Sequence, residues 1–147
     1  KRLDLLKENL KRLQINCVKT FVADANELFK LKPDLLNYFD KVLLDAPCSG
    51  IGTLARNPDA RWSLSNKKID ELIELQKKLL ESSKFFLKSN GILVYSTCTI
   101  CPRENNLLVN DFLSKNRDMH LIDQRQILPG FRDNGDGFYA AKIANKK

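Results

Sequence analysis

The sequence predicts an α/β fold, with a mostly parallel sheet and helices on both faces. Apolar stretches of strand length alternate with stretches in which apolar residues recur at helical spacing. Two predicted strands, Lys41–Leu44 and Ile92–Ser96, each end at a polar turn that carries a cysteine, Cys48 and Cys98 respectively. Ligands of open α/β sheets bind outside the carboxyl ends of the strands, so we expect both thiols at the rim of one binding crevice.

The first part of the chain predicts a helix followed by a strand. The helix is indicated by leucines at helical spacing, namely Leu3, Leu6, Leu10 and Leu13. Cys17–Val22 alternates between apolar and polar residues and predicts a strand, in which Cys17 is a small buried apolar residue. Asp24 follows directly, and we expect it at the same edge of the sheet as Asp45 and Cys98. Its carboxylate is expected either to bind a hydroxyl or amine of a ligand or to cap the next turn.

A long helix is predicted from Ser65, a good N-cap residue, to about Lys88. Asn90-Gly91 is expected to close it, with the glycine just past its end. The apolar face of this helix contains Ile69, Leu72, Ile73, Leu75, Gln76, Leu79, Leu80 and Phe86.

The segment before that helix contains Arg56, Arg61 and Trp62, the only tryptophan of the chain. Arginines bind phosphates and an indole stacks on bases, so this segment predicts an RNA contact. An ordinary loop with Trp62 packed on the core is the alternative.

The last part of the chain predicts a helix that begins near Arg103 and two further strands. Met119–Ile122 is predicted as a short strand, and Gln126–Gly135 as a loop. Asp136–Ile143 is predicted as the last strand, reached by a turn and therefore a candidate for an antiparallel position.

Composition limits the function classes. The chain has 147 residues, 43% of them hydrophobic, and a net charge of +7, which fits a single domain over residues 1–147. A basic excess suits a polyanion such as RNA, although a merely soluble basic domain is equally consistent with it. No apolar run is long enough to span a bilayer and no signal-peptide pattern opens the chain, so we expect a cytoplasmic monomer with reduced thiols and no membrane partner.

The two cysteines and the acid at the first strand end suit attack on a pyrimidine ring. A thiolate that adds to C6 makes C5 electron-rich enough to accept a methyl group. The reaction requires a nucleophile, a group that polarises the ring and a base, and Asp45, Cys48 and Cys98 fit the first two of these needs. A free thiol has a pKa of about 8.5, and the predicted helix start after Cys98 is a device that favours its thiolate.

The cysteines allow two other interpretations, a redox pair and a zinc site. Cys98 and Cys101 form a C-x-x-C pattern, which is typical of redox pairs and of half a zinc site. A structural zinc site needs four ligands, and Cys17, Cys48 and His120 lack the spacing to complete one, so no metal is expected.

Several segments resemble the signatures of the RNA 5-methylcytosine methyltransferases, in particular the bacterial 16S ribosomal RNA branch known as Sun, Fmu or RsmB. The resemblance covers essentially the whole chain. Its motifs are Asp45–Gly50, Ser96–Thr99 with Glu104-Asn105, Arg56–Trp62, Asp136–Lys142, and Arg2-Leu3 with Asn9–Leu13.

The resemblance implies a Rossmann-like fold that binds S-adenosylmethionine and acts on 16S ribosomal RNA. It implies that Cys98 attacks cytosine C6 and that Cys48 helps to release the methylated product. Asp45 would lie beside the methyl donor and the cytosine, with Pro47 next to it in the cofactor site. Asp24 matches the acid that contacts the adenine side of the cofactor.

Departures from the family pattern concern the cofactor. The chain contains no glycine-rich Pro-Gly-Gly-Lys turn and no acid for the cofactor ribose, and it begins at Lys1 without an initiator methionine. We therefore expect a sheet truncated at its N-terminal side, an incomplete cofactor site and the C-terminal part of a catalytic domain.

Three functions remain open from the sequence. The leading one is transfer of a methyl group from S-adenosylmethionine to C5 of a ribosomal RNA cytosine. In a second, which resembles the DNA cytosine methyltransferases, the roles are reversed and Cys48 is the nucleophile; the Thr-Cys motif at Cys98 argues against it. The third is a non-catalytic RNA-binding or assembly domain that retains the fold.

Overall fold

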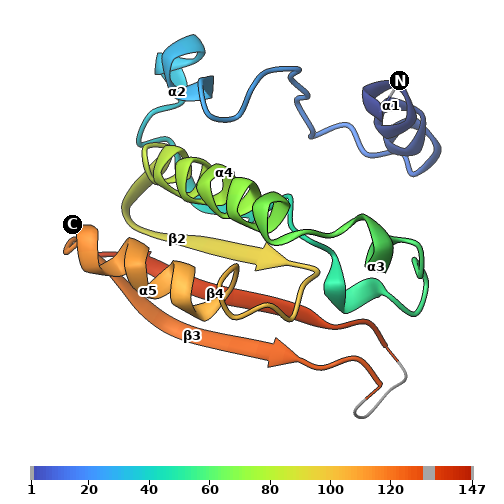
Figure 1. The fold of residues 1–147 in the computed structure, drawn as a ribbon. Coiled ribbons are helices and arrows are strands. Elements are labelled where there is room, and N and C mark those ends of the chain that lie inside the picture. The colour runs from blue at the N-terminus through green and yellow to red at the C-terminus, as the bar shows by residue number, and fades with distance from the viewer. Residues whose placement is uncertain (1, 131–134, 147) are drawn as a thin grey trace.

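Four strands form one mixed sheet in the order β1-β2-β4-β3 (Figure 1). The structure is a computed structural model that describes residues 2–130 and 135–146. The strands are β1 (Phe39–Asp45), β2 (Leu87–Thr97), β3 (Met119–Ile127) and β4 (Phe138–Asn145). β1 and β2 are parallel, and β4 runs antiparallel to both of its neighbours. The α/β class is confirmed, and so is the antiparallel last strand.

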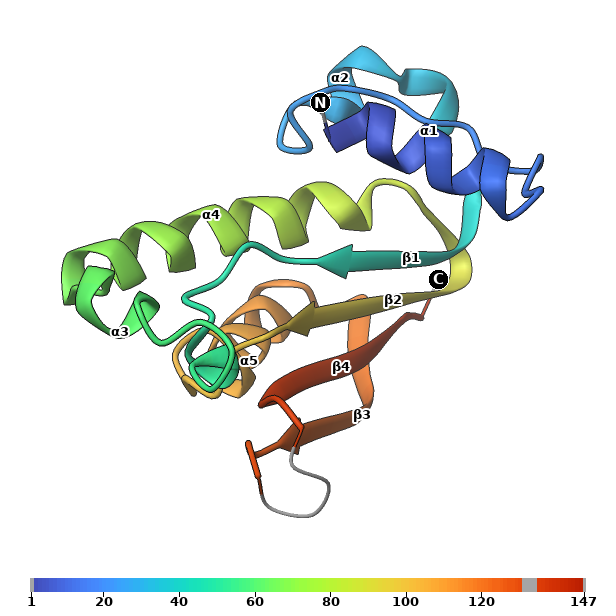
Figure 2. The ribbon, with the colours of Figure 1, turned by 90° about the vertical axis from the view of Figure 1, so that its right-hand side faces the viewer.

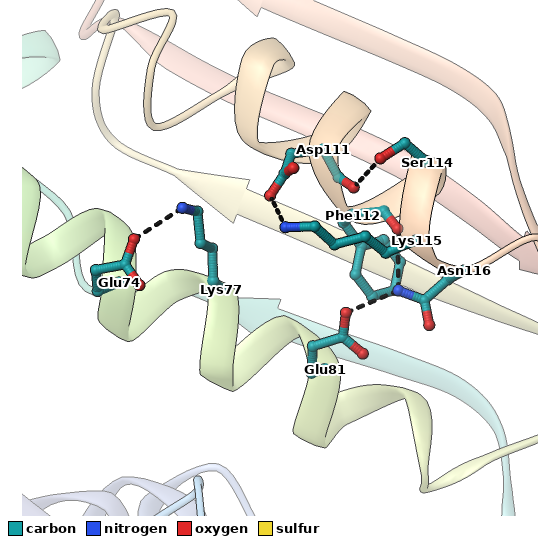
Figure 3. Close-up of polar contacts among 8 residues, drawn as sticks. All are labelled: Glu74, Lys77, Glu81, Asp111, Phe112, Ser114, Lys115 and Asn116. Atoms are coloured by element: carbon teal, nitrogen blue, oxygen red, sulfur yellow. Dashed lines mark hydrogen bonds and ion pairs between the residues drawn. The ribbon is translucent and has the colours of Figure 1, made fainter.

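Two long helices, α4 (Asn66–Lys84) and α5 (Asn106–Lys115), pack on the same face of the sheet. Figure 3 shows where they meet: Asn116, just after α5, donates to Glu81 of α4 over 2.7 Å and to the carbonyl of Phe112 over 2.9 Å. The remaining helical elements are short or peripheral, namely α1 (Arg2–Arg12), α2 (Leu28–Leu31), α3 (Ala60–Ser63) and the 3₁₀ turns η1 (Pro33–Leu35) and η2 (Ile51–Thr53).

The core lies between these two helices and one face of the sheet. Alternate residues of β2 and β4 enter it, and Leu93, Tyr95, Ala141 and Ile143 have no exposed surface. On the opposite face of the sheet, Leu43 is 70% exposed. Helices on both faces were expected, and within the described residues this is wrong: the two long helices contact each other and leave that face uncovered.

The predicted strand at Cys17–Val22 is also wrong, because this segment has no hydrogen-bonded strand partner in the sheet. A strand requires a neighbour for its backbone groups, and alternation alone does not supply one. Val22 is 83% exposed, and Cys17, expected to be buried, is exposed as well. Figure 2 shows α1, this segment and α2 beyond β1, on the far side from β3 and β4.

The long helix begins as predicted and ends earlier. Ser65 caps it, since its hydroxyl accepts from the backbone N–H of Lys68 over 3.2 Å. The helix ends at Lys84, not near Asn90-Gly91, because Phe86 and Leu87 turn into the core and β2 begins there. Asn90 instead lies in an irregularity of β2 with a φ of 60°, and Gly91 packs so tightly on Leu87 that a Cβ would lie 2.7 Å from its side chain.

Two boundaries near the C-terminus also differ from prediction. The helix expected near Arg103 begins at Asn106, after a turn in which Asn105 N–H donates to the carbonyl of Pro102. β3 extends to Ile127 because β4 offers it a partner along its whole length. Part of the predicted loop at 126–135 is therefore strand, and its residues 131–134 lie outside the described residues.

Candidate active site

The parallel pairing of β1 with β2 brings two polar turns to one edge of the sheet. Asp45 pairs with Ser96 at the carboxyl ends of these strands, and Ala46 N–H donates to the carbonyl of Ser96 over 2.9 Å. Asp45 is exposed, and its carboxylate accepts a long hydrogen bond of 3.3 Å from Ser96 Oγ. The residues that follow β1 are therefore placed beside the residues that follow β2.

The two cysteines meet there. Cys48 Sγ lies 3.3 Å from Cys98 Sγ, and both thiols are partly buried. The expected juxtaposition of Cys48 and Cys98 at the strand ends is confirmed. The C-x-x-C interpretation gains no support, because the sulfur partner of Cys98 is Cys48 and not Cys101.

The two thiols differ in their surroundings. The pKa of Cys48 is raised to about 12, first because burial disfavours its thiolate and second because of its hydrogen bond with Cys98. Backbone N–H groups of Gly50 and Cys98 oppose this rise. Cys48 is therefore a protonated thiol at neutral pH. A hydrogen bond donated by Cys48 to Cys98 Sγ would suit a nucleophilic role for Cys98, and the 3.3 Å contact allows either sulfur to be the donor.

A buried polar cluster lies directly behind the thiols. The Glu104 carboxylate, with no exposed surface, accepts from the backbone N–H of Ser49 over 2.8 Å and also from the Ser49 hydroxyl. Gln76 Nε2 donates to Glu104 over 3.0 Å and to the carbonyl of Pro47 over 2.8 Å. Ser49 Oγ also lies 2.8 Å from Thr99 Oγ1. The cluster joins the turn after β1 to the turn after β2 and to helix α4.

A second set of hydrogen bonds fixes the turn after β2. Asn105, also without exposed surface, accepts from Thr97 Oγ1 over 2.7 Å and donates to the carbonyl of Thr99 over 3.0 Å. Tyr95 OH donates to the carbonyl of Glu104 over 2.7 Å. Sequence reasoning did not single out Ser49 or Gln76 as site residues. The signal for Gln76 was present, since it is a polar residue within the apolar face of a helix.

Gly52, four residues after Cys48, permits a close approach of the backbones at Cys98 and Gly137. Gly52 donates its N–H to the carbonyl of Cys98 over 3.1 Å and accepts from the N–H of Gly137 over 2.8 Å. A Cβ on Gly52 would lie 2.2 Å from the carbonyl oxygen of Gly137, a distance that real contacts do not reach. This position therefore requires glycine for packing, not for a phosphate loop.

The segment proposed to contact RNA lies beside the thiols and points into solvent. Arg56 forms an ion pair with Asp136, which precedes β4, and its pKa is raised first by this hydrogen bond and then by the Asp136 charge, with a small contribution from Cys98. Arg61 and Trp62 lie on the short helix α3, and Trp62 is 85% exposed. The alternative in which Trp62 packs on the core is wrong.

Asp24 and Pro47, the other predicted cofactor residues, are placed differently. Pro47 lies next to Cys48, and its carbonyl is held by Gln76. Asp24 does not end a strand: its carboxylate accepts from the backbone N–H and the side-chain amide of Asn26, as a turn-capping residue does. The neighbouring carbonyl of Ala25 accepts from Ser82, near the C-terminal end of α4, so the expected place of Asp24 at the same sheet edge as Asp45 is wrong.

No cluster of three or more His, Cys, Asp or Glu side chains suited to a metal ion occurs in residues 2–130 and 135–146. Across the same ranges, no helix is both long and apolar enough to cross a membrane.

Comparison with known proteins identifies the family. The model of the 16S rRNA methyltransferase RsmB/F family matches residues 1–144. The chain belongs to the RsmB/F family. It is 41% identical to ribosomal RNA small subunit methyltransferase B of Pectobacterium atrosepticum over 97% of its own length and 34% of that protein. The chain thus spans about a third of the length of the curated RsmB/F relatives that it matches.

Solved structures agree with this RsmB/F assignment. The crystal structure of PH0851 matches with a TM-score of 0.90 at 34% identity, covering 97% of this chain and 34% of that one. NSun6 from Pyrococcus horikoshii with SFG matches with a TM-score of 0.82 at 30% identity, covering 99% of this chain and 39% of that one. The predicted Rossmann-like methyltransferase sheet is confirmed by these neighbours.

Proposed function

We propose that this chain supplies the two reactive cysteines for transfer of a methyl group from S-adenosylmethionine to C5 of a cytosine in 16S ribosomal RNA. The observation that carries the proposal is the 3.3 Å approach of Cys48 Sγ to Cys98 Sγ at the carboxyl ends of β1 and β2. Membership of the RsmB/F family and the name of the Pectobacterium relative support ribosomal RNA as the substrate.

The surroundings of the thiols support different roles for them. Cys98 Sγ forms the bond to cytosine C6, and the electron pair of the C5–C6 double bond makes C5 the atom that is methylated. The C5 proton then leaves to a base and the C6–sulfur bond breaks, which restores the double bond and frees Cys98. Cys48, protonated at first, acts in this second stage: once Cys98 is bonded to carbon, its sulfur is a neutral thioether and its charge no longer raises the pKa of Cys48.

The residues at the end of β1 fit one side of the methyl donor. The Asp45 carboxylate is exposed and Pro47 adjoins Cys48, so a ligand at this edge would lie within reach of the thiols. NSun6 bound to SFG, an analogue of S-adenosylmethionine, supports use of this cofactor in the fold. When bound, the cofactor supplies the methyl group. Asp24, turned toward Asn26, does not fit the adenine side in this arrangement.

The exposed face of α3 suits the RNA. The Arg61 side chain and the Trp62 indole are free to pair with a phosphate and to stack on a base, and the chain carries a net charge of +7.

The test traps the covalent adduct in the protein that carries this chain. Cys98→Ala is expected to abolish both methylation of 16S ribosomal RNA and covalent protein–RNA adducts. Cys48→Ala is expected to block release, so that adducts accumulate and survive denaturing electrophoresis. Cys17→Ala, an exposed thiol outside the site, is the matched control and should behave as wild type.

Two other outcomes would change the assignment of the cysteines or of the function. If Cys98→Ala accumulates adducts and Cys48→Ala does not, Cys48 is the nucleophile and the assignment is reversed. If no variant and no wild-type protein forms an adduct or methylates RNA, while RNA still binds, the non-catalytic interpretation replaces the enzyme.

A further inference from the structure

The Cys48 turn is held from both sides by one buried pair of side chains. Glu104 accepts the backbone N–H of Ser49, the residue after Cys48, and Gln76 donates to the carbonyl of Pro47, the residue before it. Gln76 and Glu104 are themselves hydrogen-bonded over 3.0 Å. These contacts hold the backbone on both sides of Cys48.

The same pair reaches the other cysteine. The Ser49 hydroxyl donates to Glu104 and lies 2.8 Å from the hydroxyl of Thr99, which follows Cys98. The residues that follow the two cysteines are therefore joined through one hydroxyl, and the Glu104 carboxylate orients that hydroxyl.

Burial of the Glu104 and Gln76 side chains costs free energy, because both are polar and are removed from water. Both side chains have no exposed surface, and none of the ion pairs found among the described residues involves Glu104. A buried carboxylate without a cation needs several hydrogen-bond donors, and here all three are neutral. Gln76 Oε1 is buried without a partner in the described part of the chain. A leucine at this position of α4 would avoid that unpaired oxygen.

We propose that Glu104 and Gln76 are positioning residues that set the distance between the two thiols and thereby control the step in which Cys48 acts. This inference rests on the proposed function for its consequence in catalysis, but its geometric content concerns only the two sulfurs. Neither side chain is within hydrogen-bonding contact of a sulfur; they act through the Pro47–Ser49 backbone and the Ser49 hydroxyl.

Disulfide formation measures the distance between the thiols without RNA or cofactor. Oxidised glutathione converts the two thiols of Cys48 and Cys98 to a disulfide and is itself reduced to two glutathione molecules. In the protein that carries this chain, wild type should form the Cys48–Cys98 bond, identified by peptide mass mapping. Glu104→Leu should slow this bond by about tenfold to a hundredfold, because the Cys48 turn is then no longer held in place.

Two further variants grade the effect. Glu104→Gln retains an oxygen for Ser49 N–H, and its amide donates to the Ser49 hydroxyl, which turns to donate to Thr99; it should therefore restore a rate close to wild type. Gln76→Leu loses the bond to Pro47 but leaves Ser49 on Glu104, so its rate should lie between those of Glu104→Leu and wild type. Gln76→Leu and Glu104→Gln decide the matter if Glu104→Leu does not fold.

Asn116→Leu is the matched control for loss of stability alone. Asn116 is a buried polar residue hydrogen-bonded between the C-terminal ends of α4 and α5 (Figure 3). It should lower the melting temperature without changing the rate of the Cys48–Cys98 bond. If it slows that bond as much as Glu104→Leu does, or if Glu104→Leu and Gln76→Leu oxidise like wild type, the proposal is overturned.

Adduct measurements connect the geometry to the reaction. Glu104→Leu should form protein–RNA adducts at the wild-type rate through Cys98 but release them slowly, as Cys48→Ala does. Equal losses in adduct formation and release would contradict control of the Cys48 step. If no variant forms adducts while the disulfide rates still rank as expected, the proposed function fails and the positioning role stands.

Discussion

Gly52 shows how a single residue holds the site together. It lies between the turn after β2 and the start of β4, and its backbone is hydrogen-bonded to Cys98 on one side and to Gly137 on the other. No side chain fits there, because even a methyl group would overlap the carbonyl oxygens of both neighbours.

Gly52→Ala is therefore expected to lower the free energy of unfolding by about 1–3 kcal/mol, as overpacked sites do. Chemical denaturation followed by circular dichroism measures this loss. Gly135→Ala is the matched control, since a Cβ there meets no atom within 4 Å and the variant should unfold like wild type. Equal stability of the two variants would show that the contact relaxes freely.

At the same scale, the pKa of Cys48 is open to direct test. It is raised from 9.0 to about 12 by burial first and by Cys98 second, so removal of the Cys98 sulfur should lower it while burial keeps it above 9.0. In Cys98→Ala, the midpoint of the pH dependence of Cys48 alkylation, followed by mass spectrometry, should shift toward lower pH than in wild type. An unchanged midpoint would mean that burial alone sets the pKa.

The effect of Cys48 on stability has a fixed sign. Between pH 9 and 12 the unfolded chain loses the Cys48 proton while the folded chain retains it, so stability from this group is present below pH 9 and is lost as the pH rises toward 12.

Among the elements, α4 matters most, because it closes the core and carries Gln76 to the Cys48 turn. Its first turn depends on the Ser65 cap, whose hydroxyl accepts from Lys68 N–H. Most helical stability comes from tertiary packing, and the buried residues of this helix lie from Ile73 onward, beyond the first turn.

Ser65→Ala is expected to lower the free energy of unfolding by about 1 kcal/mol. Ser65→Asp should retain most of the stability that the cap provides, because aspartate is also a good N-cap residue. Thermal denaturation checks both. Ser63→Ala is the control, since Ser63 is exposed on α3 and its hydroxyl donates only to a carbonyl of its own turn. A loss from Ser65→Ala no larger than that from Ser63→Ala would show that the cap contributes nothing.

For the whole molecule, the decisive feature is that β1 is an edge strand with an uncovered face. Leu43 on that face is 70% exposed, and the segment from Cys17 to Val22 has no strand partner. The chain has no glycine-rich turn whose backbone N–H groups seat a nucleotide, and Asp24 is occupied by Asn26.

This 147-residue chain is therefore expected to bind S-adenosylmethionine more weakly than the longer curated relatives that it partly matches. Isothermal titration calorimetry of this chain beside the Pectobacterium relative provides the comparison. Micromolar affinity of this chain by itself for S-adenosylmethionine would contradict the expectation. It would imply that Asp45 and the end of β1 are sufficient to bind the cofactor.

Local chemistry explains why much of the fold was predictable. The helical spacing over α4, its serine cap and the two apolar strands that end at cysteines depend on neighbours within a few residues, and these predictions hold. The failures share one cause. Asn90-Gly91 has the form of a helix end and Cys17–Val22 that of a strand, but burial of Phe86 and Leu87 and the lack of a pairing partner overrode those local preferences.

The sequence by itself determined that Cys48 and Cys98 lie together, because two thiols after two apolar strands converge in a parallel pairing of those strands. It did not determine how they are held. Glu104, Gln76 and Ser49 are far apart in the chain, and the buried hydrogen bonds among them exist only once α4 packs over the strand ends. The raised pKa of Cys48 has the same origin, since burial and a sulfur neighbour fifty residues away are properties of the folded molecule and not of any local stretch.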